Sequence, residues 1–131
     1  MPSATLDHPQ LGCLHFIGGE GLWIGKTARG DEFCIQADFF DDHPDPECEA
    51  LAVRELSDFE GLLARIEAFL AIAREPYLDQ WASRRWEVNS MVFSREDDRP
   101  TFVAKFLLER DDYTTWLVRV ENGVPVALSR R

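Results

Sequence analysis

Apolar and polar residues alternate with a period of two along the first third of the chain, as they do in half-buried strands. The alternation runs through three segments, 11–17, 22–26 and 32–38, with glycine-rich or polar turns between them. In the third segment, Phe33 and Ile35 alternate with more polar neighbours. The pattern predicts a three-stranded antiparallel meander.

The spacing of apolar residues becomes helical in the middle of the chain. Asp45 followed by Pro46 matches an N-cap and a first helical position. Small and apolar residues then recur at helical spacing over 47–56. We expect a short helix here, although a strand through Leu51 and Val53 also fits the pattern.

A longer helix is predicted directly afterwards. Ser57 and Glu60 have the spacing of a capping box, which places the start of this helix at Ser57. Its apolar stripe consists of Phe59, Leu62, Leu63, Ile66, Phe69, Leu70 and Ala73. Because the residue before a proline avoids the helical conformation, we expect the helix to end near Arg74 and another short helix to start at Pro76.

Period two returns in the last third of the chain. The segments are 88–94, 101–109, 113–121 and 124–129. Asn122-Gly123, between the last two, is a strong hairpin signal because both residues tolerate positive φ. Pro125 cannot donate a ladder hydrogen bond, so the last strand should lie at a sheet edge. Antiparallel strands from both ends of the chain, packed on central amphipathic helices, make an α+β fold.

The length of 131 residues and the hydrophobic content of 45% suit a single α+β domain over 1–131, with residues 1–8 expected to be flexible. We expect Trp81 and Trp116 in its core. The chain has no leader-like start and no apolar run of about 20 residues, and its three cysteines are spaced as reduced thiols rather than as a disulfide framework. These features predict a soluble cytoplasmic protein.

The net charge of −10 is concentrated in thirty residues. Between Asp31 and Glu60 there are eleven acidic side chains and one base, Arg54, whereas acids and bases balance in the rest of the chain. Such crowding costs about 1 kcal/mol for each close like-charged pair near water, unless a cation lies opposite. The acidity opposes binding to nucleic acid and to anionic membranes. It predicts a docking surface for a basic protein partner at Asp38, Asp41, Asp42, Asp45, Glu47 and Glu49.

The acidic segment also fits roles that need no basic partner protein. The carboxylates crowd the start of a predicted helix, where the helix dipole stabilises them. Arginines of the second half, such as Arg95, or a second copy of the chain in a homodimer could neutralise them. The cluster Asp41–Asp45, which includes His43, could instead serve a small divalent-metal-binding protein or metal-dependent enzyme. It does not match an EF-hand, because Pro46 and Ala52 replace the glycine and the glutamate that such a loop needs.

The sequence contains no recognised catalytic motif. The glycines in 18–21 lack the Gly-Lys-Ser/Thr ending and the helix of a phosphate loop, and there is no Gly-x-Ser-x-Gly elbow. Cys13 and His15 share a strand face but have no zinc-site spacing. The reactivity of Cys48 is left open. We therefore predict no catalytic residue, no cofactor and no metal ligand set.

Two short motifs stand in the first two predicted strands: Leu11-Gly12-x-Leu14 and Trp23-x-Gly25-Lys26. Together with the acidic strand and the long helix that follow, they resemble a family of small acidic bacterial domains of unknown function. Some members of that family are suspected immunity proteins, which neutralise a toxin made by the same cell. The resemblance implies a similar fold and a non-catalytic, immunity-like protein-binding role, with a toxin as the basic partner.

Overall fold

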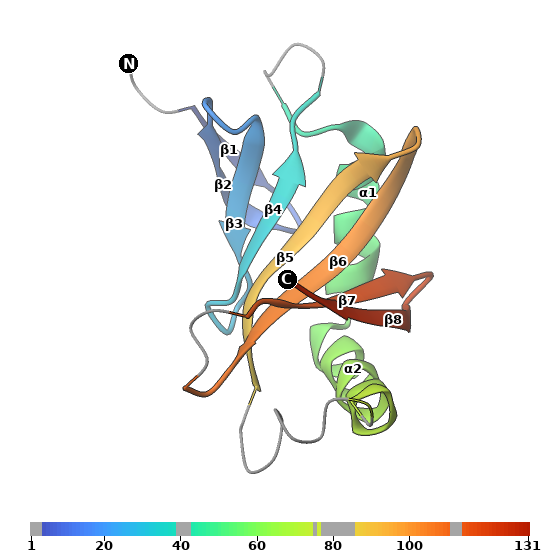
Figure 1. Cartoon of the computed structure of the whole chain (residues 1–131). Helices are drawn as coiled ribbons and strands as arrows, with labels where there is room; N and C mark the ends of the chain where they lie inside the picture. Colours follow the sequence, from blue (N-terminus) through green and yellow to red (C-terminus); the bar gives the residue numbers. More distant parts are fainter. Residues whose placement is uncertain (1–3, 39–42, 75, 77–85, 111–113) are drawn as a thin grey trace.

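The computed structural model describes residues 4–38, 43–74, 76, 86–110 and 114–131. These residues form one sheet of eight strands with two helices inserted in the middle of the chain (Figure 1). The elements are β1 Thr5–His8, β2 Gly12–Ile17, β3 Leu22–Lys26, β4 Glu32–Gln36, α1 Pro46–Leu56, α2 Phe59–Ala73, β5 Trp86–Glu96, β6 Arg99–Leu108, β7 Trp116–Glu121 and β8 Val124–Arg130. The predicted α+β class, in one domain with a β-meander at each end, is confirmed.

The strands lie in the sheet in the order in which they follow along the chain. Neighbouring strands are antiparallel except β4 and β5, which run parallel with Phe33 opposite Met91 and Ile35 opposite Phe93. A parallel pair needs a crossover connection, which α1 and α2 supply. The two meanders are thereby joined into one continuous sheet.

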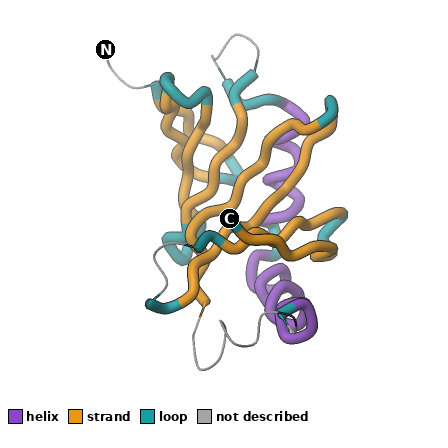
Figure 2. The backbone as a smooth tube through the Cα atoms, in the orientation of Figure 1, coloured by secondary structure: helices purple, strands orange, loops and turns teal. Residues whose placement is uncertain are grey.

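Both helices lie on the same side of the sheet (Figure 2). The helix expected over 47–56 is confirmed as α1, which packs across β4, β5 and β6 and buries Cys48 and Ala52. α2 runs beside β8 and buries one stripe of side chains, Leu62, Ile66 and Leu70. The opposite face of the sheet carries no helix among the described residues (Figure 1).

The N-terminal meander has four strands, so the expected three-stranded arrangement is incomplete. Strand β1 lies within residues 1–8, where we expected a flexible segment. The ring Nδ1 of His8 accepts hydrogen bonds from the backbone N–H groups of Gln10 and Leu11, both at 3.1 Å, and so closes the β1–β2 turn. A four-residue strand gives only a weak sequence signal, although its exposed and half-buried residues alternate in the structure.

The start of α2 differs from the predicted capping box. Ser57 is the C-cap of α1, and its hydroxyl donates to the carbonyl oxygen of Arg54 at 2.7 Å. Asp58 is the N-cap of α2, and its Oδ1 accepts from the N–H of Gly61 at 3.1 Å. Serine and aspartate are both good N-caps, and the last turn of α1 already uses the serine. The two helices therefore follow each other almost without a loop.

The turns of the C-terminal meander agree with the sequence pattern. Asn122 and Gly123 have φ angles of 50° and 76°, as the predicted hairpin between β7 and β8 requires. Pro125 lies in β8, which is an edge strand, as expected. Trp116 is fully buried in the core, also as expected. Trp81 and the short helix expected from Pro76 fall on 77–85, outside the described residues.

Candidate docking surface at the start of α1

The segment that links β4 to α1 is closed at its base by hydrogen bonds. Ala37 and Pro44 form an isolated antiparallel bridge. The N–H of Asp38 donates to the carbonyl of His43 at 2.9 Å, and the Asp38 carboxylate lies 3.0 Å from Nδ1 of the His43 ring. Asp41 and Asp42 lie outside the described residues. The base of this segment is therefore held in one geometry relative to the sheet.

The Asp45 side chain is buried and forms hydrogen bonds within the fold. One carboxylate oxygen, Oδ1, accepts the N–H groups of Glu47 and Cys48, both at 3.0 Å, which makes Asp45 the N-cap of α1. The other, Oδ2, accepts from Nε of Arg95 at 2.7 Å. Burial works to raise the pKa of Asp45, but the hydrogen bonds from Arg95 and Cys48 outweigh it, so that this pKa lies below its usual value. The side chain stays ionised, and both of its oxygens already accept hydrogen bonds within the fold.

Arg95, near the end of β5, organises the surroundings of Asp45. Its Nη2 bonds Glu47 Oε1 at 2.6 Å, and its Nη1 donates to the carbonyl of Asp98 at 3.0 Å. Its backbone N–H donates to the side-chain oxygen of Gln36 at 2.9 Å. The hydrogen bonds to Asp45 and Glu47 raise the pKa of the guanidinium, which therefore stays charged. One arginine is thus shared between two carboxylates, and the group keeps a net negative charge.

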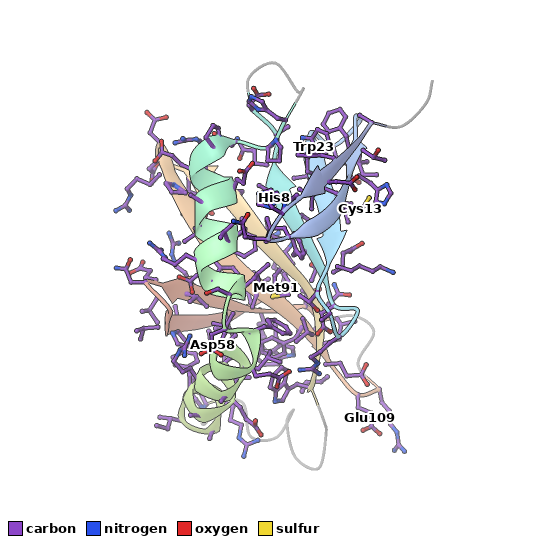
Figure 3. All side chains as sticks on the ribbon, turned by 180° about the vertical axis from the view of Figure 1, so that it is seen from behind. His8, Cys13, Trp23, Asp58, Met91 and Glu109 are labelled. Carbon is purple, nitrogen blue, oxygen red and sulfur yellow. The ribbon has the colours of Figure 1, made fainter. Side chains whose placement is uncertain are left out.

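Glu49 faces a different part of the molecule. Its carboxylate lies 3.3 Å from Nε2 of His8, which is almost buried between the β1–β2 hairpin and α1 (Figure 3). Of the residues predicted from the charge pattern, the structure brings Asp38, Asp45 and Glu47 to one end of the molecule and places Glu49 apart from them. Every one of these four carboxylates has a partner inside the chain. Part of the expected intramolecular neutralisation is therefore present.

A hollow of about 600 Å³ opens beside this end of the sheet. Acidic side chains from three places line it, Glu20, Asp38 and Asp45, and Arg95 is the only basic side chain in its described lining. The β2–β3 turn is fixed here because the N–H of Ala37 donates to the carbonyl of Gly21 at 2.9 Å. The sequence analysis did not predict Glu20 as a contact residue. It lies in a glycine-rich turn, and that turn indicated only a flexible backbone.

The metal-binding alternative stays a prediction, because Asp41 and Asp42 of the predicted cluster lie outside the described residues. Within the described part of the chain, no three histidine, cysteine or acidic side chains come close enough to hold a metal ion. Asp45 uses both of its oxygens within the fold, and the Asp38 carboxylate already lies against the His43 ring.

The two motifs that carry the family resemblance have structural roles of their own. Gly12 has a φ of +79°, a conformation that side chains other than that of glycine rarely adopt. A Cβ atom at Gly25 would lie 2.6 Å from the ring of Phe33 and 2.7 Å from a methyl group of Leu14. Trp23 is buried in the core. These residues therefore help to shape the first hairpins.

None of the described helices is long and apolar enough to cross a membrane. Comparison with protein families, with curated proteins and with solved structures found no match to this chain. The resemblance to the small acidic bacterial domains therefore stays a prediction.

Proposed function

We propose that this chain is a non-catalytic binding protein that docks a positively charged surface of another protein onto its acidic end. We define the acidic end as Glu20, Asp38 and Glu47. Asp41 and Asp42 belong to the surface predicted from the sequence but lie outside the described residues. The observation that carries the proposal is the excess of carboxylates over the single arginine at the hollow between the β2–β3 turn, β4 and β5. Asp45 is left out of the contact surface, because it caps α1 and binds Arg95.

The three carboxylates of the acidic end differ in exposure. The side chain of Glu47 is 63% exposed, and its second carboxylate oxygen has no partner among the described residues. Glu20 is exposed at the rim of the hollow, and Asp38 lies deeper, with 12% of its side chain exposed. A lysine or arginine of a partner can meet Glu47, which Arg95 already holds in place, and Glu20 at the rim of the hollow. Such preorganisation lowers the entropic cost of docking.

The class of partner follows from the charge and from the family resemblance. A protein that binds nucleic acid presents a cationic surface, and the carboxylates of the acidic end would take the place of substrate phosphates there. An immunity-like role in the bacterial cytoplasm, against a toxin that binds nucleic acid, fits both the charge of the acidic end and the family resemblance. Association driven by such charges is fast at low salt and slows steeply as salt screens the attraction.

The experiment is an affinity capture from the native cell with three baits. One is the parent chain, the second carries Glu20→Gln, Asp38→Asn and Glu47→Gln, and the third removes the same charge elsewhere through substitutions at exposed positions, Glu67→Gln, Glu87→Gln and Glu109→Gln. We expect a basic protein to be retained by the parent and by the third bait, and lost from the second. Capture of the same proteins by all three baits would contradict the proposal. Circular dichroism of each bait establishes that it is folded.

A calorimetric titration tests the metal-binding alternative independently. Docking predicts neither heat nor a rise in melting temperature when Ca²⁺, Mg²⁺, Mn²⁺ or Zn²⁺ is added at micromolar concentration. Heat that disappears in an Asp41→Asn, Asp42→Asn variant would favour a metal site instead.

A further inference from the structure

The face of the sheet opposite the helices has a hollow of its own, over β5, β6, β7 and β8. It measures about 410 Å³. Its apolar floor is made of Val92, Val103 and Leu117, and the hydroxyls of Ser94 and Ser129 stand at its sides. The volume lies within the range of pockets that hold small organic molecules, about 300–1,000 Å³.

The strand register brings these side chains together. Val92 is opposite Val103, and Val103 is opposite Arg119 on the next strand. In the neighbouring row, Lys105 is opposite Leu117, which is opposite Ser129. Side chains two apart on a strand share a face, so both rows point away from the helices. The apolar floor is therefore flanked by polar and cationic groups.

The hollow is lined by several cationic side chains, although the chain as a whole is strongly negative. Its lining contains three cationic side chains, Lys105, Arg119 and Arg131, against one carboxylate, Glu96. Arg119 is paired, since it lies 3.3 Å from Glu96 and 3.5 Å from Glu121. Lys105 and Arg131 form no ion pair within the described part of the chain. The charge of an unpaired cation beside an apolar floor is available to a ligand.

The environment of Cys34 supports the position assigned to Lys105. Cys34 lies opposite Val92, on the same face of the sheet. Burial raises the pKa of its thiol to about 11, and the positive charge of Lys105 acts in the opposite direction. The carboxylates of Glu32 and Glu20 add to the effect of burial. The strand register places Lys105 on the same face as Val92 and Val103.

We propose that this hollow binds a small organic anion with an apolar body, such as a carboxylate or sulfonate on an aromatic or aliphatic group. The apolar body would cover Val92, Val103 and Leu117, and the anionic group would meet Lys105. Because the net charge of −10 repels anions at long range, binding depends on these short-range contacts. This site is separate from the acidic end and does not depend on the proposed docking function.

The test uses two fluorescent probes that share the same aromatic rings, anilinonaphthalene sulfonate and the uncharged phenylnaphthylamine. We expect the folded protein to bind the sulfonate more tightly than the uncharged probe. Lys105→Gln should raise the Kd of the sulfonate by about fivefold, the effect of losing one partly exposed ion pair, and leave the uncharged probe unchanged. Lys26→Gln, which removes a cation from another strand, is the matched control. Equal binding of both probes, or an unchanged Kd in Lys105→Gln, would overturn the proposal.

A second variant and a second measurement show whether the fluorescence comes from this hollow. Ala127→Phe fills the hollow from the edge strand and should abolish sulfonate binding, while a urea midpoint close to that of the parent shows that the fold is intact. Shifts of the Val92 and Val103 methyl resonances locate the probe. If a second copy of the chain occupies the hollow, light scattering will show a dimer and the apparent Kd will rise with protein concentration, which would also overturn the proposal.

Discussion

At the scale of single residues, Asp45 performs two tasks with its two oxygens, and substitutions can separate them. Asp45→Asn keeps an acceptor for the N–H groups at the start of α1 and removes the charge that faces Arg95. Asp45→Ala removes both. We expect Asp45→Ala to lower the free energy of unfolding by about 1 kcal/mol more than Asp45→Asn, the usual cost of losing an N-cap. Urea denaturation of the two variants measures this difference, and equal midpoints would contradict the capping role.

The same carboxylate predicts a pH dependence. The pKa of Asp45 is lowered in the fold, so the group binds its proton less readily in the native state than in the unfolded one. Its stabilisation is then fully present above the unfolded pKa of about 3.9, and it is lost as the pH falls through the lower, folded pKa. The difference in free energy of unfolding between the parent and Asp45→Asn should be constant from pH 7 to 5 and shrink below about pH 4. If this difference in free energy of unfolding grew as the pH fell, it would contradict a lowered pKa of Asp45 in the fold.

The three cysteines should differ in reactivity. Burial raises the pKa of the Cys34 thiol to about 11 and that of Cys48 to about 12, where the Asp45 carboxylate adds to the effect. Cys13 is exposed on β2. Because the thiolate is the reactive form, we expect iodoacetamide at pH 8 to label Cys13 alone in the folded chain and all three in urea. Mass spectrometry counts the labels. Modification of Cys48 without denaturant would contradict its buried position.

At the scale of elements, the packing of β3 on β2 and β4 depends on a residue without a side chain. Gly25→Ala would push a Cβ atom into Phe33 and Leu14, both of which are fully buried. Overpacking of this kind destabilises a fold by about 1–3 kcal/mol. Gly19→Ala is the control, since its Cβ meets nothing within 4 Å and its backbone needs no positive φ. Thermal unfolding of both variants checks the prediction. A Gly25→Ala variant as stable as the parent would contradict it, and would show that Phe33 and Leu14 can move to make room for the added methyl group.

The elements that the sequence predicted well are those with local signals. Asp45-Pro46 marked the start of α1, and Asn122-Gly123 marked the last hairpin, because caps and tight turns involve residues close together in the chain. The failures also have local reasons. Ser57 satisfies the spacing of an N-cap but belongs to the last turn of α1, and β1 is so short that it gives only a weak sequence signal.

At the scale of the whole molecule, the uneven charge predicts how stability responds to salt. Carboxylates outnumber cations by ten in the chain, and even Arg95 must serve two of them. Screening by salt should therefore weaken the repulsion between carboxylates more than it weakens the attraction within ion pairs. We expect the Tm to rise by a few degrees between low salt and 0.5 M sodium chloride, measured by calorimetry. A fall in Tm would mean that the internal ion pairs dominate the electrostatics of the fold.

The candidate sites were predictable only in part. The excess of acid between Asp31 and Glu60 was visible in the sequence, as were Asp38 and Glu47 as candidate contacts. Arg95 was among the arginines that could neutralise the acidic segment, but its pairing with Asp45 and Glu47 was not predictable, because it meets Asp45 from 50 residues away. Glu20 and Lys105 gave no signal of their own, since a single charged residue acquires meaning only from its neighbours in space.

What the sequence determined by itself was the fold class, most of the strands and helices, the start of α1, the last hairpin turn, and the bias of charge along the chain. These properties depend on residues that are neighbours in the chain. The tertiary structure decided which carboxylates share a cation and which face of the sheet carries Lys105 above an apolar floor. The pairing of β4 with β5 joins the two meanders, so that Arg95 at the end of β5 lies beside the start of α1. The register of β5, β6, β7 and β8 brings Lys105 and the apolar floor to one face.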